Sequence, residues 1–274
     1  MRRRMLLKTT GLVIFEKKQS EQDRLLTILT PENGMILARV NSPGRMKGKL
    51  AAGTEFLTYS EFTLFLRKEV AVVDAAEPKR LFYGMRTDPE KLALAAYFAR
   101  LTYDLFSSAA KEDCAGALRL FLNTLAFLEE DKMPKALLKA VFEMRCMAMS
   151  GYRPDLSACR ICKKSAGDMV FFLPQRGQLI CSECENHSAE EKIPLNGDLL
   201  CAMKSAMSSD LKEAFSFRLG EKNLLCFAFL AESYCIARLE YLPATLRYYK
   251  SICESLEAYM PPTFSGENPE KGSL

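Results

Sequence analysis

The chain has 274 residues, of which 49% are apolar and 26% are charged, proportions that are ordinary for a soluble folded protein. No apolar run reaches the roughly 18–20 residues that a membrane-spanning helix needs, which excludes a bilayer span. The net charge is only +4, but residues 1–50 hold 11 Lys or Arg against 4 Asp or Glu. This asymmetry indicates an anionic partner for the N-terminal part, although charge alone does not distinguish such a partner from a solvated basic face.

The ten cysteines do not predict a disulfide-bonded secreted scaffold, because such scaffolds are much shorter chains. Six of the ten lie in apolar helical patterns, where a free cysteine behaves as a small buried hydrophobe. These six are Cys114, Cys146, Cys201, Cys226, Cys235 and Cys253. We expect them in the core, and we expect the protein in a reducing cytoplasm.

Residues 1–80 have the pattern of short β-strands. The first residues are basic and then apolar, but no small-residue cleavage site follows, so they predict a strand and not a signal peptide. Strands are expected at 11–15, 24–30, 35–40, 55–66 and 70–74. A hairpin loop, PENG, joins the second to the third, and a basic loop rich in Gly and Pro follows. About five short strands in this length predict a small barrel.

The hydrophobic period becomes helical at residue 88, so the whole chain has an α+β organisation. Asp88 is the expected N-cap of the first helix, and Pro89 is its expected first residue. One face of this helix is expected to contain Leu92, Ala95, Ala96, Ala99 and Tyr103. Further helices are expected at about 113–130, 134–150, 197–208, 222–241 and 244–259. The final segment, 261–274, is predicted to be a disordered tail.

Four cysteines outside these helices follow the pattern C-x2-C-x18-C-x2-C, and they are Cys159, Cys162, Cys181 and Cys184. This spacing is typical of a structural zinc site, because each Cys-x-x-Cys turn directs two thiolates at one ion and two turns complete a tetrahedron. Between the pairs, two strand-like runs flank the turn PQRG, as in the hairpin of a zinc ribbon. Four protein ligands leave no open position on the ion, so the site is predicted to stabilise structure and not to catalyse a reaction.

Other interpretations of the four thiols have weaker support. A redox Cys-x-x-Cys usually belongs to a βαβ unit, and the pattern contains none. A pair of disulfides conflicts with a reducing compartment, and a loop that folds without metal is a further alternative. His187, the only histidine, is an alternative ligand, but we expect its imidazole to be exposed.

The chain resembles the RecO family of bacterial recombination mediators over roughly residues 5–256. Three stretches carry the resemblance: TGLVIFEKKQSEQDRLLTILTPENGMILA (10–38), SGYRPDLSACRICKK (150–164) and GQLICSEC (177–184). The resemblance implies an N-terminal five-stranded OB-fold barrel, followed by an all-helical domain that carries an inserted four-cysteine zinc ribbon. We place the barrel at 1–80, the two parts of the helical domain at 81–156 and 191–260, and the ribbon at 157–190.

The same resemblance implies a function in DNA repair and recombination. Proteins of this family bind single- and double-stranded DNA and anneal complementary strands. With the partner RecR they help to load RecA on DNA coated by single-stranded DNA-binding protein. The implied cofactor is structural Zn²⁺ and the implied location is the cytoplasm, at the nucleoid. The chain has one histidine, no Gly-rich phosphate loop and no nucleophile motif, so we do not expect an enzyme and assign no catalytic residue.

OB barrels bind strands in a basic groove whose aromatic side chains stack on bases. The predicted DNA contacts are Arg39, Arg45, Lys47 and Lys49, on or beside the basic loop, with Lys17 and Lys18 after the first strand. Four aromatic residues are alternative stacking platforms, namely Phe15, Phe56, Tyr59 and Phe62. We expect these four to fill the barrel core instead, because a small barrel needs large inward side chains.

The C-terminal helical region contains the predicted protein-docking site. An acidic tail that ends in an apolar residue, such as that of single-stranded DNA-binding protein, requires an apolar pocket with a basic rim. The stretch LEYLPATLRYYK (239–250) offers both, and the predicted contacts are Leu242, Leu246, Arg247 and Lys250. A helical core explains the apolar members equally well.

Three other classes of protein fit parts of the pattern. An RNA-binding protein with an OB barrel and a zinc ribbon has the same charge and the same folds, and preference for RNA over DNA distinguishes it. A zinc-bearing redox switch requires metal release coupled to disulfide formation. A purely structural zinc module that assembles with protein partners requires no nucleic-acid binding at low salt.

Overall fold

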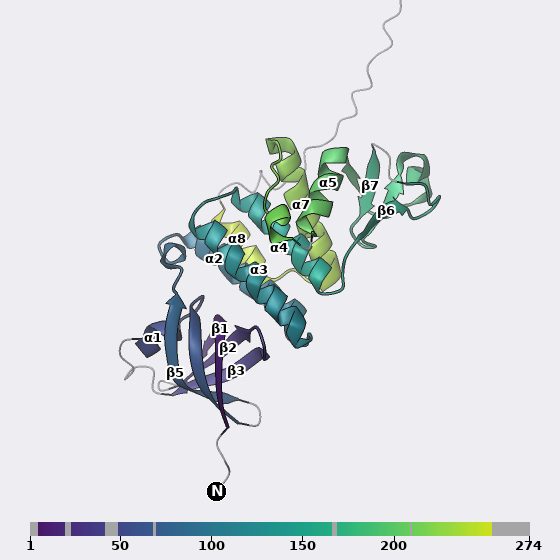
Figure 1. The fold of residues 1–274 in the computed structure, drawn as a ribbon. Coiled ribbons are helices and arrows are strands. Elements are labelled where there is room, and N and C mark those ends of the chain that lie inside the picture. Colours follow the sequence, from purple (N-terminus) through teal and green to yellow (C-terminus); the bar gives the residue numbers. More distant parts are fainter. Residues whose placement is uncertain are drawn as a thin grey trace, which may run out of the picture.

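The computed structural model of the protein describes residues 5–19, 23–41, 49–67, 70–165, 169–208 and 210–253. Its N-terminal part is a closed barrel of five strands in the order β1-β2-β3-β5-β4 (Figure 1). The strands are β1 (Met5–Lys18), β2 (Asp23–Thr30), β3 (Gly34–Asn41), β4 (Tyr59–Leu66) and β5 (Ala71–Arg80). All neighbours are antiparallel except β3 and β5, whose parallel pairing closes the barrel. This arrangement is the OB fold.

The barrel strands are longer than the sequence pattern predicts. β1 begins at Met5, and its first half pairs with β4 while its second half pairs with β2. Pairing on both sides extends a strand through polar residues that lie on the outer face. Residues 55–58 form a turn, so β4 begins at Tyr59, and a short helix, α1 (Lys49–Gly53), precedes it. The predicted hairpin is confirmed, and Gly34 ends its turn with a positive φ of 69° that favours glycine.

The helical part contains the expected helices and one short helix that the periodicity does not show. The elements are α2 (Pro89–Phe106), α3 (Lys111–Glu129), α4 (Lys135–Met149), α5 (Gly197–Ala206), α6 (Leu211–Ala214), α7 (Glu221–Leu239) and α8 (Ala244–Ile252). Asp88 is the N-cap of α2, since its carboxylate accepts hydrogen bonds from the N–H groups of Glu90 (2.9 Å) and Lys91 (3.1 Å). The chain from residue 254 onward, which includes the end of the last predicted helix and the predicted tail, lies outside the described residues.

The predicted inner face of α2 is wrong in part. Leu92 and Tyr103 are exposed, whereas Leu94, Phe98 and Leu101 are fully buried. The helix is packed on several sides, because α3, α4, α8 and β1 all contact it, and a single apolar stripe therefore does not describe it. Aromatic rings form the centre of this core, where Phe98 lies 4.3 Å from Phe142 between ring centroids.

The four-cysteine region forms a separate small sheet. Its strands are β6 (Asp155–Cys159), β7 (Val170–Leu173), β8 (Gln178–Cys181) and β9 (Ile193–Leu195), in the order β6-β8-β7-β9. β7 and β8 form the predicted hairpin, and Gly177 in the PQRG turn has a φ of 66°. A 3-10 helix, η3 (Ser182–His187), follows β8 and carries the last cysteine of the motif.

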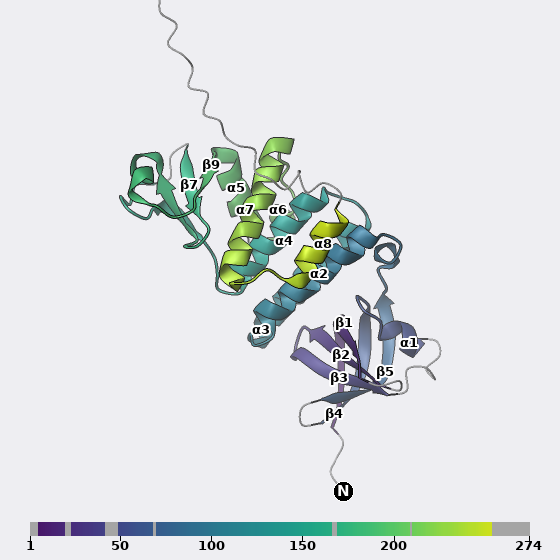
Figure 2. The same ribbon diagram turned by 180° about the vertical axis from the view of Figure 1, so that it is seen from behind.

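The barrel and the four-cysteine sheet lie at opposite ends of the molecule, with the helices between them (Figures 1 and 2). Strands β1, β2 and β3 contact α2 and α3, and the ring of Phe15 packs edge-on against Tyr103 with 5.3 Å between centroids. No helix in the described ranges is both long and apolar enough to cross a membrane.

Four of the six cysteines predicted in the core are buried, namely Cys114, Cys146, Cys226 and Cys235. Cys253 is half-buried. Cys201 is exposed, which corrects the prediction for this residue. It lies on the outer side of α5, whose inner side buries Leu199 and Met203.

Candidate metal centre and nucleic-acid interface

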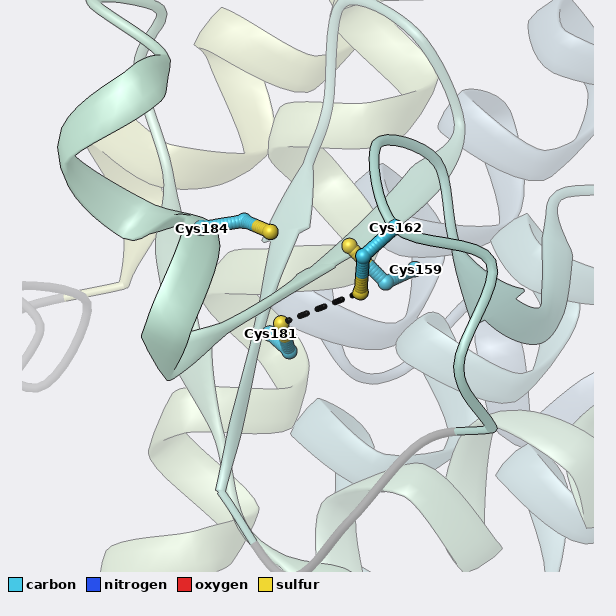
Figure 3. Close-up of side chains that lie close together, drawn as sticks. All are labelled: Cys159, Cys162, Cys181 and Cys184. Carbon is cyan, nitrogen blue, oxygen red and sulfur yellow. Dashed lines mark hydrogen bonds between the residues drawn. The ribbon is translucent and has the colours of Figure 1, made fainter.

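The four cysteines of the motif converge on one point, as Figure 3 shows. Cys159 ends β6, Cys162 lies in the turn that follows, Cys181 ends β8, and Cys184 lies in η3. Their Sγ atoms all lie within 4.8 Å of one another, and those of Cys162 and Cys181 are 3.7 Å apart. A tetrahedron with Zn–S bonds of roughly 2.3 Å has edges of about 3.8 Å, so the cluster has the size that a zinc ion requires. The four cysteines are positioned to bind a metal ion.

The environment of the first cysteine favours a thiolate. Burial raises the pKa of Cys159, but the backbone N–H groups of Cys162, Cys181 and Ile161 point at its sulfur and lower the pKa to about 6. The pKa of Cys184 is raised to about 12 by burial and by its hydrogen bonds to the other three sulfurs. Without a cation the cluster therefore does not hold four negative charges, whereas a divalent ion at its centre stabilises all four thiolates.

His187 is not part of the cluster. Its side chain is exposed at the end of η3, and the four mutually close ligand atoms are all sulfurs. The expectation of an exposed imidazole is confirmed. Two salt bridges surround the centre, Lys164 with Glu183 (2.7 Å) and Arg160 with Glu190 (3.4 Å). These pairs join the first cysteine turn to η3 and to the segment behind it.

Basic side chains lie on the outer face of the barrel. Lys17 pairs in register with Leu25, and Leu25 pairs with Arg39, so these three side chains lie on one face of β1, β2 and β3. Lys17 and Lys18 are exposed and Arg39 is half-buried. The Nε of Arg39 is shielded from solvent and has no hydrogen-bond partner among the described residues. Arg45 and Lys47 lie outside the described residues, and Lys49 begins α1 with a side chain that is not described.

Of the four aromatic residues weighed for base stacking, only Phe62 fills the barrel core as expected. Phe62 is fully buried inside the barrel. Phe15, Phe56 and Tyr59 are half-buried and pack against the large core that runs from the barrel into the helices. Phe65 is half-buried and, unlike Phe62, is not part of the barrel core. The alternation of side chains along β4 predicts this difference, because Phe62 and Leu64 point into the barrel and Phe65 does not.

The predicted protein-docking residues separate into exposed and internal ones. Leu242 is 38% exposed, and Arg247 is exposed on α8. Leu246 is fully buried, which corrects the prediction that it lines a surface pocket: it holds α8 to the core. The ammonium of Lys250 forms an ion pair with Glu232 of α7, so it also has an internal role.

The fold and the site define an OB-fold protein whose helical domain carries a four-cysteine metal-binding site. The chain belongs to the RecO family of DNA repair and recombination mediators. The family's N-terminal part, "Recombination protein O N terminal", matches residues 1–82, and its C-terminal part, "Recombination protein O C terminal", matches residues 86–232.

Curated relatives of the chain carry the name "DNA repair protein RecO". The protein from Acetivibrio thermocellus is 32% identical over 248 residues, which cover 90% of this chain and 97% of that protein. The protein from Alkaliphilus metalliredigens is 31% identical over 180 residues, covering 66% and 72%. One from Dehalococcoides mccartyi is 30% identical over 190 residues, covering 69% and 74%.

Proposed function

We propose that the protein binds single- and double-stranded DNA and anneals complementary strands. With RecR, it helps to load RecA on DNA coated by single-stranded DNA-binding protein, in the cytoplasm at the nucleoid. One observation carries the proposal: an OB barrel in a RecO-family chain has Lys17 and Arg39 in one row on its outer face, with Leu25 between them. Cationic side chains on the outer face of a sheet suit the phosphate oxygens of a strand.

The mechanism requires no catalytic group. Two complementary strands repel each other through their phosphates, and a protein that neutralises both lowers the barrier to pairing. Lys17 and Arg39 hold one backbone, and we expect Lys18 at the end of β1, with Arg45, Lys47 and Lys49, to add further phosphate contacts. Because the contacts are to phosphates, we expect little sequence preference and a strong dependence on salt.

We propose that the metal is Zn²⁺ and that its role is structural. When bound, the ion cross-links the first cysteine turn to β8 and η3. The hydrophobic cluster at this end of the molecule is small, since its buried members are Cys159, Leu173, Ile180 and Cys184, and two of them are ligands. The other face of the sheet packs on the helical core through Phe172, Leu179 and Leu195. We therefore propose that the four thiolates and their ion hold together the side of the ribbon that carries the cysteines.

The C-terminal helices offer the surface that we propose for an acidic, apolar-ended tail. Leu242 and Tyr248 are exposed at 38% and 61%, and Arg247 is exposed next to Tyr248. Leu242 and Tyr248 offer apolar contact to the last residue of such a tail, and Arg247 offers a cation to its terminal carboxylate. With Leu246 and Lys250 engaged internally, the proposed site is restricted to the three exposed residues. The affinity for a tail peptide, measured by titration, should therefore weaken after Arg247→Glu.

The test is the affinity for labelled single-stranded DNA across a salt series, with matched RNA and duplex DNA beside it. On a single strand, each phosphate that the protein neutralises adds about 0.7 to the slope of log affinity against log salt. Lys17→Ala and Arg39→Ala should each weaken binding and flatten the slope, whereas Lys212→Ala, an exposed lysine of α6 in the helical part, should change neither. Added complementary strand reports annealing in the same samples.

Each outcome decides between the classes of protein. Salt-dependent DNA binding with accelerated annealing supports the mediator. Tighter binding to RNA supports an RNA-binding protein instead. Absence of any nucleic-acid binding at low salt contradicts the proposal and leaves a zinc-bearing assembly module.

A further inference from the structure

A hollow of about 620 Å³ lies where the four-cysteine sheet meets the helical part of the chain. Its lining comes from three segments: Tyr152 in the approach to β6, Gln175 in the turn between β7 and β8, and residues between positions 236 and 241 at the end of α7. Cavities of roughly 300–1,000 Å³ at the junction of two structural units are typical of ligand sites. The hollow is separate from the metal cluster and from the barrel, because neither contributes a described residue to its lining.

Hydrogen bonds from α7 hold the other two segments of the lining in place. The hydroxyl of Tyr234 donates to the backbone carbonyl of Tyr152 at 2.7 Å. The guanidinium of Arg238 donates to the backbone carbonyl of Pro174 at 3.4 Å and to that of Gln175. The same guanidinium lies over the ring of Tyr234, 5.4 Å from its centroid. Because these walls are fixed before a ligand arrives, binding costs little ordering entropy.

Two tyrosine rings supply the aromatic surface of the hollow. Tyr152 and Tyr241 both line it and are 46% and 41% exposed. The hydroxyl of Tyr241 accepts a hydrogen bond from Arg100 at 3.2 Å, which fixes the position of its ring. Ile236 and Ala237 complete the apolar lining. Exposed aromatic faces of this kind suit a planar ring that stacks on them.

The polar lining of the hollow consists of one amide, one guanidinium and one carboxylate. They belong to Gln175, Arg238 and Glu240. One positive and one negative charge offset each other, so the lining favours a neutral ligand over a cation or an anion. The amide both donates and accepts, the guanidinium only donates, and the carboxylate only accepts. A neutral planar ring with donors and acceptors on its edge matches this set, and a nucleobase is such a ring.

Guanine matches the lining better than the other bases do. Its N1–H and N2–H groups lie side by side, and both donate to one carboxylate such as that of Glu240. Its O6 and N7 atoms accept from a guanidinium or an amide, here Arg238 or Gln175. Adenine, cytosine and thymine do not present two adjacent donor groups, so a carboxylate discriminates against them.

A series of contacts connects the hollow to the basic face of the barrel. Tyr241 contacts Arg100 of α2, and the guanidinium of Arg100 lies 5.9 Å from the ring centroid of Tyr103, one turn further along α2. Tyr103 packs against Phe15 of β1, with 5.3 Å between ring centroids. Phe15 and Lys17 are two residues apart on β1 and therefore lie on the same face of the sheet. A strand held at Lys17 thus has a short path to the hollow.

We propose that this hollow receives one unpaired guanine base of a single strand whose phosphates lie on the basic row of the barrel. The inference rests on the proposed DNA binding and adds a base contact at the junction of the helical part and the ribbon. In a duplex the N1–H and N2–H groups of guanine pair with cytosine, so only an unpaired guanine offers them to Glu240. The contact therefore distinguishes single strands from duplex, which phosphate contacts alone do not.

The first experiment compares two single strands that are longer than the roughly 4–16 nucleotides that an OB fold covers. One contains only thymine, and the other carries a single internal guanine. The unaltered protein should bind the second roughly 5- to 150-fold more tightly, the effect of one good bidentate contact to a base. Glu240→Gly should bring this ratio close to one. Because residue 240 has a φ of 62°, which favours glycine, the variant should fold as well as the unaltered protein.

The matched control is Glu221→Gln. It removes an exposed carboxylate from the opposite end of α7, outside the hollow, and should keep the preference for guanine. The slope of log affinity against log salt should be the same for Glu240→Gly, Glu221→Gln and the unaltered protein, because none of these changes removes a phosphate contact.

A second experiment detects the base in the hollow directly. The chain contains no tryptophan, so Tyr152→Trp introduces a single fluorophore there. Its emission should be quenched by the guanine-containing strand much more strongly than by the thymine strand or by duplex. Tyr83→Trp, at a residue that is 64% exposed in the segment between barrel and helices, is the control and should not distinguish the three. Guanosine monophosphate should quench only at far higher concentrations, since the barrel does not hold it.

The outcomes distinguish this inference from the function on which it rests. If the unaltered protein binds both strands equally and with a steep salt slope, the guanine site is wrong and the phosphate-binding face stands. A preference for guanine that survives in Glu240→Gly also overturns the site. If guanosine monophosphate binds as tightly as the strand, the hollow is not a contact to the strand. If the unaltered protein binds no DNA at low salt, the proposed function and this inference both fail.

Discussion

At the scale of single residues, the four cysteines of the motif are the side chains whose spatial arrangement most directly indicates their role, which is to bind a metal ion. The Sγ atoms of Cys162 and Cys181, from opposite Cys-x-x-Cys pairs, are 3.7 Å apart, close to the edge of a zinc tetrahedron. Cys201 is also a free cysteine, but it is exposed on α5 and outside the cluster. Cys181 and Cys201 thus provide a matched pair for testing the site.

We expect purified protein to carry one zinc ion per chain, and Cys181→Ser to lose it, because three thiolates hold the ion far more weakly than four. Metal content by mass spectrometry measures this loss, and thermal unfolding measures the accompanying destabilisation of the ribbon. Cys201→Ser should keep the metal and the melting temperature. Retention of one equivalent of zinc by Cys181→Ser would contradict the four-thiolate assignment.

At the scale of elements, buried charges join three helices of the helical domain. Lys139 of α4 lies 2.7 Å from Glu143 and 2.9 Å from Glu232 of α7, measured from the ammonium nitrogen to a carboxylate oxygen. Lys250 of α8 forms an ion pair with the other oxygen of Glu232. The hydroxyl of Tyr97 donates to Glu143 at 2.6 Å. Removing one member of such a network leaves another charge buried without compensation, which is costly.

Glu232→Ala should therefore lower the free energy of unfolding by about 3–5 kcal/mol, because Lys139 is deprived of a partner in the core. Glu61→Ala is the control: it breaks the exposed ion pair with Lys79 and should cost about 0–1 kcal/mol. Denaturant unfolding followed by circular dichroism measures both. Equal destabilisation of the two variants would show that the buried network contributes no more to the free energy of unfolding than an exposed ion pair does.

The same network has a defined pH dependence. Burial raises the pKa of Glu232, but Lys139 and Lys250 outweigh it, so the pKa is lowered. Its stabilising contribution is present above the ordinary glutamate pKa and disappears as the pH falls through the lowered value. Burial raises the pKa of Glu143, whose contribution is present at low pH and is lost as the pH rises through the raised value. In denaturant unfolding at a series of pH values, acidification should therefore destabilise the unaltered protein more than Glu232→Ala.

At the scale of the whole molecule, one carboxylate fastens the barrel to the helices. Glu129, at the end of α3, accepts hydrogen bonds from Arg80 of β5 (3.2 Å) and from the N–H of Gly84 in the connecting segment (3.1 Å). Its backbone carbonyl accepts from Lys91 of α2 at 3.2 Å. These interactions set the direction in which the barrel's outer face points relative to the helical surface proposed for protein partners.

Glu129→Ala should loosen this junction and speed tryptic cleavage at Arg80 and Arg86 by roughly fivefold, the equivalent of about 1 kcal/mol of local opening free energy. Glu130→Ala is the control, because Glu130 is more exposed and its closer partner is Lys132. Cleavage rates are read from the first fragments formed. An unchanged rate in Glu129→Ala would mean that other contacts, such as Phe15 with Tyr103, hold the junction.

Local patterns in the sequence were sufficient for the metal centre and for the class of each region. The four thiols converge because two tight turns and one hairpin, all encoded within short stretches, direct them. The N-cap at Asp88 and the hairpin at Gly34 are likewise determined by neighbours along the chain. The stretches 10–38, 150–164 and 177–184 carried the resemblance to the family.

Only the tertiary structure decided which side chains face solvent and which lie next to one another. Alternation along β4 separates two faces without saying which becomes the barrel interior, and the closure of β3 on β5 is what places Arg39 beside Val72. The burial of Leu246 and the exposure of Cys201 depend on how α8 and α5 dock against distant helices. The sequence shows how apolar residues are spaced along a helix or strand, but the element that covers each of its faces comes from elsewhere in the chain.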